Sequence, residues 1–197
     1  MLFKEENLGE GRVSRLVEQI LAETVDRLKT IEEKYGYLSY LIEERFTNEK
    51  LLQLEVMRIV SIRPEVVEYL PEKPYDFASK EKCDFWFRTS DSTEHWMEIK
   101  MRPTNYRVMQ SRAKHAKAIT NGVDGIIEDI RRLERNAPKY GVKYVLFVFY
   151  PMYPESYPIF NRKHLPRISE AADKEVVSPS RSVQVGDASL DLYFIEL

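Results

Sequence analysis

Hydrophobic residues recur at helical spacing over the first sixty residues of the chain. In residues 13–34 an apolar side chain returns every three or four positions, which predicts a long amphipathic helix that ends before Gly36. The same spacing predicts a second helical region over 37–62. This region is expected to break at 47–48, where a threonine and an asparagine can each cap a new helix, and to end before Pro64.

From residue 65 onward the pattern changes to short apolar runs that are typical of β-strands. The strands expected from these runs are 65–70, 83–87, 95–101, 143–150 and 190–195. Two further helices are expected, at 122–136 and 161–173. The order helix, three strands, helix, strand predicts an α/β fold with a mixed central sheet flanked by helices.

Composition narrows the class of protein. The chain has 197 residues, of which 43% are hydrophobic and 31% charged, as in a water-soluble globular protein. It has one cysteine, Cys83, which excludes an internal disulfide and a cysteine zinc cluster. We find no apolar run long enough to span a bilayer, no secretory signal and no linker. We therefore expect one domain over 1–197, a cytoplasmic location and no membrane partner.

Positive charge is concentrated in one segment although the net charge is −2. Residues 101–120 contain five basic residues and no acidic one. These bases are Arg102, Arg107, Arg112, Lys114 and Lys117. A basic segment can hold the phosphates of a nucleic acid, and a solvated helix face is the alternative interpretation.

The candidate chemistry lies in the third expected strand. Side chains alternate along a strand, so Glu98 and Lys100 point to one face and their apolar neighbours to the other. A hairpin turn at 88–94 would bring Asp84 alongside them. Two carboxylates supply the hard oxygen ligands that Mg²⁺ prefers, and a lysine can orient water or stabilise negative charge. The alternative is a cross-strand ion pair at a sheet edge.

Asp84 and Glu98-Ile99-Lys100, together with the helix before the first strand, resemble the PD-(D/E)xK nuclease superfamily. The resemblance spans about 44–150, leaving 1–36 as an additional N-terminal helical extension and 151–197 as a C-terminal helix and strand. It implies a restriction-endonuclease-like fold and a deoxyribonuclease that depends on Mg²⁺ or Mn²⁺. Asp84 and Glu98 would bind the metal and Lys100 would assist the attacking water. The family's usual proline before the aspartate is replaced here by Cys83.

The resemblance also implies a further glutamate from the preceding helix. Glu55 and Glu49 compete for this catalytic role, and we favour Glu55 because it lies nearer the first strand and follows an apolar run. Asp129 matches a polar position that the family has on the helix after the Glu-x-Lys strand. We expect it instead to be a solvent-facing charge that pairs within its own helix.

DNA is the expected partner, with RNA not excluded, and the five bases of 101–120 would hold its phosphates. Two other functions fit the same sequence. One is a catalytically inactive nucleic-acid-binding protein of this fold. The other is an oligomeric structural or assembly protein, since helix 13–34 could form a homodimer surface or cover the sheet.

Overall fold

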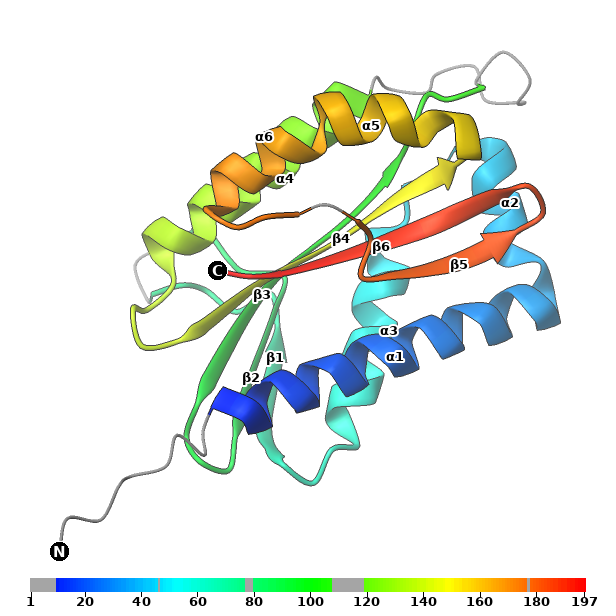
Figure 1. Cartoon of the computed structure of the whole chain (residues 1–197). Helices are drawn as coiled ribbons and strands as arrows, with labels where there is room; N and C mark the ends of the chain where they lie inside the picture. The colour runs from blue at the N-terminus through cyan, green and yellow to red at the C-terminus, as the bar shows by residue number, and fades with distance from the viewer. Residues whose placement is uncertain (1–9, 46, 77–79, 108–118, 177) are drawn as a thin grey trace, which may run out of the picture.

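The computed structural model describes residues 10–45, 47–76, 80–107, 119–176 and 178–197, and only the backbone of 10–14. A six-stranded mixed sheet lies between two layers of helices (Figure 1). The strands are β1 Val66–Pro71, β2 Phe85–Thr89, β3 Glu94–Pro103, β4 Val142–Met152, β5 Arg181–Val185 and β6 Ala188–Glu196. The helices are α1 Glu10–Tyr35, α2 Tyr37–Glu44, α3 Glu49–Ser61, α4 Ile119–Asn136, α5 Tyr157–Lys163 and α6 Leu165–Ala172, with a 3-10 turn at Pro154–Ser156. The predicted α/β class is confirmed.

The sheet runs in the order β1-β2-β3-β4-β6-β5. Strands β1, β2 and β3 form an antiparallel meander, and β4 then lies parallel to β3. A parallel neighbour requires a crossover connection, and α4 lies within it. Strand β6 pairs antiparallel with β4, and β5 forms the far edge. Strand β3, which carries Glu98 and Lys100, is therefore an interior strand.

Helices α1, α2 and α3 cover one face of the sheet (Figure 1). Apolar residues of α1 such as Ile20 and Leu28 are 1% exposed and belong to the same core as Phe85 and Leu190 of the sheet. The apolar face of helix 13–34 therefore packs on the sheet, which is one of the two roles that the sequence left open for this helix.

Helices α4, α5 and α6 cover the opposite face (Figure 1). Their apolar residues pack on Trp96 of β3, on Phe147 and Phe149 of β4, and on Tyr193 of β6. Gly122 brings α4 close to the sheet, because a Cβ there would lie 3.3 Å from the side chain of Arg102. Further along α4, Asp129 and Arg132 form ion pairs with Lys100 and Glu98 of β3.

Most expected elements are present, with two differences. The break at 47–48 is confirmed, and Asn48 caps α3 by accepting from the Leu51 N–H at 3.2 Å. The helix expected at 161–173 is instead two short helices, α5 and α6. Strand β5 was not predicted.

None of the helices in the described ranges combines the length and the hydropathy that crossing a membrane would require.

Candidate active site

Strand β3 directs the two charged side chains at the centre of the site. Met97, Ile99 and Met101 enter the core that includes α1 and α3. Glu98 and Lys100 point to the opposite face, where both contact helix α4. The alternation expected for this segment is therefore present, as a regular strand requires.

Glu98 is fully buried and both of its carboxylate oxygens are engaged. Arg132 of α4 donates to it twice, from Nε to Oε1 at 3.1 Å and from Nη2 to Oε2 at 2.6 Å. The hydroxyl of Tyr75 also donates to Oε1. Removing a carboxylate from water disfavours its charge, and a two-pronged bond to a guanidinium is a strong way to compensate for that cost.

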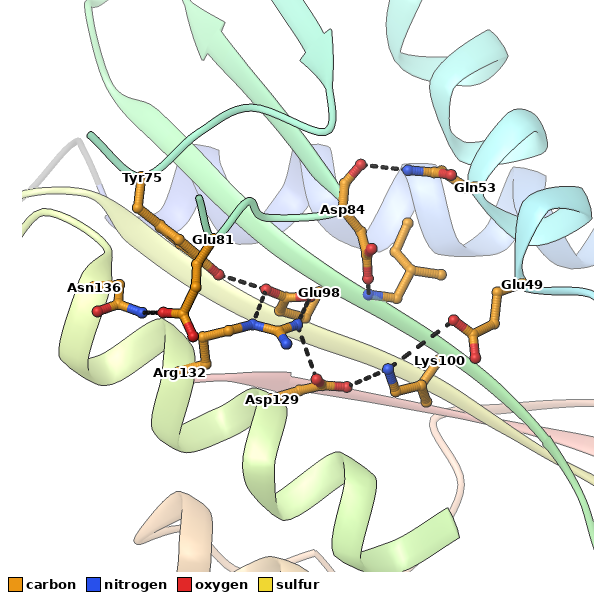
Figure 2. A network of polar contacts seen from close by, with 11 residues as sticks. Glu49, Gln53, Tyr75, Glu81, Asp84, Glu98, Lys100, Asp129, Arg132 and Asn136 are labelled. Atoms are coloured by element: carbon orange, nitrogen blue, oxygen red, sulfur yellow. Dashed lines mark hydrogen bonds and ion pairs between the residues drawn. The ribbon is translucent and has the colours of Figure 1, made fainter. Parts of the chain in front are cut away.

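Asp129 joins this pair to Lys100. Its Oδ1 lies 2.9 Å from Arg132 Nη2, and its Oδ2 lies 3.0 Å from Lys100 Nζ (Figure 2). Asp129 is only 2% exposed, so the expectation of a solvent-facing charge was wrong. Lys100 lies on an interior strand and pairs with this residue of helix α4. The alternative of a cross-strand ion pair at a sheet edge therefore does not describe Lys100.

Asp84 immediately precedes β2. The β2–β3 register pairs Phe85 with Met97, which carries Asp84 to the position opposite Glu98. Its Oδ2 accepts from the backbone N–H of Ile99 at 2.8 Å, while its backbone carbonyl accepts from the Gln53 side chain of α3. These two bonds anchor Asp84 to β3 and α3 (Figure 2).

The N-terminal end of α3 brings Glu49 to the same group. Glu49 Oε1 lies 2.9 Å from Arg102 Nη1, and Oε2 lies 4.0 Å from Lys100 Nζ. In Figure 2, Lys100 lies between Glu49 and Asp129. Its side chain is only 14% exposed, so two carboxylates hold its amine in a partly dehydrated position.

Glu55, the helix glutamate favoured from the sequence, does not pair with Lys100 or Arg102 as Glu49 does. It forms an ion pair with Arg27 of α1, Nε to Oε2 at 3.0 Å. Glu55 lies six positions after Glu49 on α3, which is about 1.7 helical turns. Glu49 is therefore the α3 carboxylate that contacts Lys100.

Burial raises the pKa of three carboxyls in the group: Glu49, Glu98 and Asp129. The neighbouring cations oppose this rise, chiefly Lys100 for Glu49 and Asp129, and Arg132 for Glu98. The charge of Asp84 acts on all three carboxyls in the upward direction. Burial lowers the pKa of Arg132, but Glu98, Asp129 and Tyr75 together raise it by more, so the guanidinium keeps its charge.

The oxygens of this group suit a hard cation in kind, because Mg²⁺ takes carboxylate ligands. The hydrogen bonds that these oxygens already accept leave no place for such a cation at Glu98. Arg132 and Tyr75 together use both Glu98 oxygens. Across the part of the chain that the structure describes, no three side chains of Asp, Glu, His or Cys are arranged to hold one metal ion. The site in this arrangement therefore does not fit a divalent cation at Glu98.

The residues proposed to hold nucleic acid are only partly described. Arg102 pairs with Glu49 beside Lys100. Arg107 pairs with Glu155 and Asp187, and its guanidinium lies 4.0 Å from the centre of the Tyr153 ring. The other three bases, Arg112, Lys114 and Lys117, lie outside the described residues.

Sequence reasoning missed Arg132 and Tyr75. Asp129 lies three residues after Ile126 and four before Leu133, so its place on the apolar stripe of α4 was a usable signal of burial. Arg132 follows Asp129 at the i,i+3 spacing at which helix side chains meet. Tyr75 lies in the loop between β1 and β2, where no periodicity marks it, and its ring stacks on Trp96 at 5.6 Å.

Comparison of the chain with protein-family models, with curated protein sequences and with solved structures finds no match.

Proposed function

We propose that this protein hydrolyses phosphodiester bonds in DNA, with Asp84, Glu98 and Lys100 at its centre and Mg²⁺ or Mn²⁺ as its cofactor. The observation that carries the proposal is the placement of these residues around β3: Asp84 accepts from the Ile99 N–H between Glu98 and Lys100, and Glu49 lies 4.0 Å from Lys100 Nζ. Holding a lysine amine among carboxylates in a partly buried position costs desolvation free energy, which the ion pairs to Asp129 and Glu49 have to offset.

The order of elements supports a restriction-endonuclease-like core as part of this proposal. A helix, α3, precedes an antiparallel meander of three strands, and α4 leads to the parallel strand β4. Asp84 lies immediately before the second strand, and Glu98 with Lys100 in the third. This is the pattern on which the resemblance to PD-(D/E)xK nucleases rests.

Each residue has a role in the proposed reaction that its surroundings favour. The Lys100 amine would stabilise the negative charge that develops on the phosphate as water attacks. Burial raises the pKa of Glu49, and a carboxylate with a raised pKa is better suited to accept a proton from that water. Arg102, beside Glu49, would hold a phosphate oxygen. A bound divalent cation would add charge neutralisation at the phosphate.

The first test is cleavage of plasmid and single-stranded DNA by the purified chain with Mg²⁺, with Mn²⁺ and with chelator. We expect nicks or breaks only with a divalent cation, and at least a ~100-fold loss in Asp84→Asn, which removes a charge and keeps the shape. Asp26→Asn is the matched control, since Asp26 is an exposed residue of α1. Cleavage that persists in chelator or in Asp84→Asn would refute the proposal.

A second candidate function is supported by one contact, the engagement of Glu98 by Arg132. An arginine that permanently satisfies this carboxylate would leave a nucleic-acid-binding protein without hydrolytic activity. Fluorescence anisotropy with labelled DNA separates the two candidates. Binding without cleavage under every cation tested would favour this second function.

A further inference from the structure

Arg45 is a buried arginine with unused hydrogen-bond donors. It is the C-cap residue of α2 and is only 6% exposed. Its Nη2 donates to the backbone carbonyl of Tyr106 at 2.8 Å, whereas its Nε and Nη1 are buried and have no hydrogen-bond partner. A guanidinium keeps its charge in proteins. Most of this charged group is therefore held out of water with nothing to accept from it.

No carboxylate compensates for the burial of Arg45 among the residues that the structure describes. Burial lowers the pKa of Arg45, and the groups that act against this shift are the phenols Tyr153 and Tyr150 rather than acids. The basic segment 101–120 contains no acidic residue that could pair with it. A buried charge without a partner is costly, so an anion from outside the chain would stabilise the folded protein here.

The two other described bases that the sequence assigned to phosphates already have acidic partners. Arg102 lies 2.9 Å from a Glu49 oxygen, and Arg107 forms ion pairs with two exposed acids. A phosphate at either guanidinium has to compete with a carboxylate for the same N–H groups. Arg45, which the sequence did not single out, is the base in this region whose donors are not used by an acid.

Arg45 lies next to the candidate active site. Burial raises the pKa of the Tyr150 hydroxyl on β4, while Arg102 and Arg45 both lower it, so both guanidinium groups lie near this one hydroxyl. The hydroxyl is itself buried without a partner. Arg102 is 30% exposed and pairs with Glu49, which also contacts Lys100. The cations thus continue from Lys100 past Arg102 to Arg45.

We propose that Arg45 is the charge centre of a phosphate-binding subsite beside Arg102, and that this subsite holds a backbone phosphate next to the bond that is cut. The assignment to DNA rests on the proposed function. Phosphate oxygens accept strong hydrogen bonds from guanidinium groups. Because neither an acid nor water screens the Arg45 charge, it attracts an anion that lies on the exposed side of Arg102.

The first test measures phosphate binding by the full chain without DNA. Urea unfolding is followed in inorganic phosphate and in chloride at the same ionic strength. A ligand that binds only the folded state raises the urea midpoint, so phosphate should raise it for the wild type and not for Arg45→Met. Arg88→Met is the matched control, since Arg88 is exposed and pairs with Glu68. An equal phosphate effect in Arg45→Met and the wild type, or no effect in the wild type, would overturn the inference.

The urea midpoint of Arg45→Met in chloride is a separate readout. We expect it to be at least as high as that of the wild type, because the substitution removes a buried charge that no acid matches. A lower midpoint, or failure of the variant to fold, would mean that the fold itself uses this charge and would contradict the inference.

Fluorescence anisotropy with labelled DNA tests the assignment to backbone phosphates. Arg45→Met should bind DNA about tenfold more weakly than the wild type, and its slope of log affinity against log salt should be smaller by about one. Arg45→Lys keeps the charge and should keep the wild-type slope. A wild-type slope in Arg45→Met, or an equally reduced slope in Arg45→Lys, would refute the assignment.

These results are separable from hydrolysis. A phosphate effect that depends on Arg45, in a protein that neither binds nor cleaves DNA, would support the phosphate subsite and refute both its assignment to DNA and the nuclease. DNA cleavage by the wild type, with the same phosphate response in Arg45→Met, would refute the subsite and leave the nuclease supported.

Discussion

At the scale of single residues, the protein is defined by ionisable groups that have been removed from water. Glu98 and Asp129 have almost no exposed surface and depend on Arg132 and Lys100 for compensation. Breaking such a buried pair by removing one partner costs about 3–5 kcal/mol, because the other charge is left alone. The same contacts therefore hold α4 on the sheet and position the amine of Lys100.

The choice between the two α3 glutamates gives a prediction at this scale. Glu49→Gln should slow DNA cleavage by about 100-fold, since Glu49 contacts Lys100 and would accept a proton in the reaction. Glu55→Gln should cleave at the wild-type rate, because Glu55 pairs with Arg27 instead. Single-turnover rates of the two variants decide the question, and the opposite order would return the role to Glu55.

His95 gives a prediction about pH. It is fully buried between Phe87 and Tyr144, and burial lowers its pKa to about 4, below the ordinary value of 6.5. Between pH 6.5 and pH 4, His95 is protonated in the unfolded chain but not in the folded one. The contribution of His95 to the free energy of unfolding is therefore fully present above about pH 6.5 and is lost as the pH falls toward 4. The loss from pH 7 to pH 5 should be about 2 kcal/mol.

Urea unfolding of the wild type and His95→Phe at both pH values measures this contribution. The variant should lose about 2 kcal/mol less than the wild type between pH 7 and pH 5, whatever its absolute stability. An equal loss in both proteins would show that other groups carry the acid sensitivity.

Some residue-level features were open to sequence reasoning and others were not. Strand alternation was sufficient to place Glu98 and Lys100 on one face of β3. The position of Asp129 on the apolar stripe of α4 was visible but was outweighed by the general tendency of charged residues to be exposed. The bond of Tyr75 to Glu98 depends on the path of an irregular loop, which no pattern of spacing predicts.

At the scale of elements, the sequence indicated those with strong periodicity or strong caps. Helix α3 begins where Asn48 can cap it, and β4 is an apolar run of the kind that lies inside a sheet. Strand β5 was missed because only one of its five residues is buried and it forms a sheet edge. Its signal was the turn Gly186-Asp187 between two alternating segments, which is typical of a hairpin.

Close packing at Gly141 gives a prediction for the turn that leads into β4. A Cβ at this position would lie 2.7 Å from Cδ1 of the Trp96 indole, a rigid ring that cannot easily move aside. Gly141→Ala should therefore lower the free energy of unfolding by about 1–3 kcal/mol.

Gly125→Ala in α4 is the control for this prediction. Its new Cβ would meet only Lys100 Cε, at an ordinary 3.9 Å, and alanine favours helix over glycine. Chemical denaturation should rank Gly125→Ala at or above the wild type and Gly141→Ala below it. Similar stability of the two variants would mean that Trp96 adapts without cost.

At the scale of the whole molecule, two helical layers meet around one interior strand. Helix α3 belongs to the layer that packs with α1, and α4 to the opposite layer, yet Glu49 and Asp129 both reach Lys100. The candidate site is thus a junction between the layers, assembled from α3, β2, β3 and α4. Sequence order could predict the sheet and its flanking helices, but the meeting of both layers at one lysine is a property of the assembled fold.

The measurement that tests the central claim most directly is the single-turnover rate of DNA cleavage by Lys100→Ala, compared with Lys139→Ala. Both substitutions remove one lysine charge, but Lys139 is exposed in the turn after α4. We predict that Lys100→Ala cleaves at least ~100-fold more slowly than the wild type, while Lys139→Ala keeps the wild-type rate. Cleavage by Lys100→Ala at the wild-type rate would contradict the account.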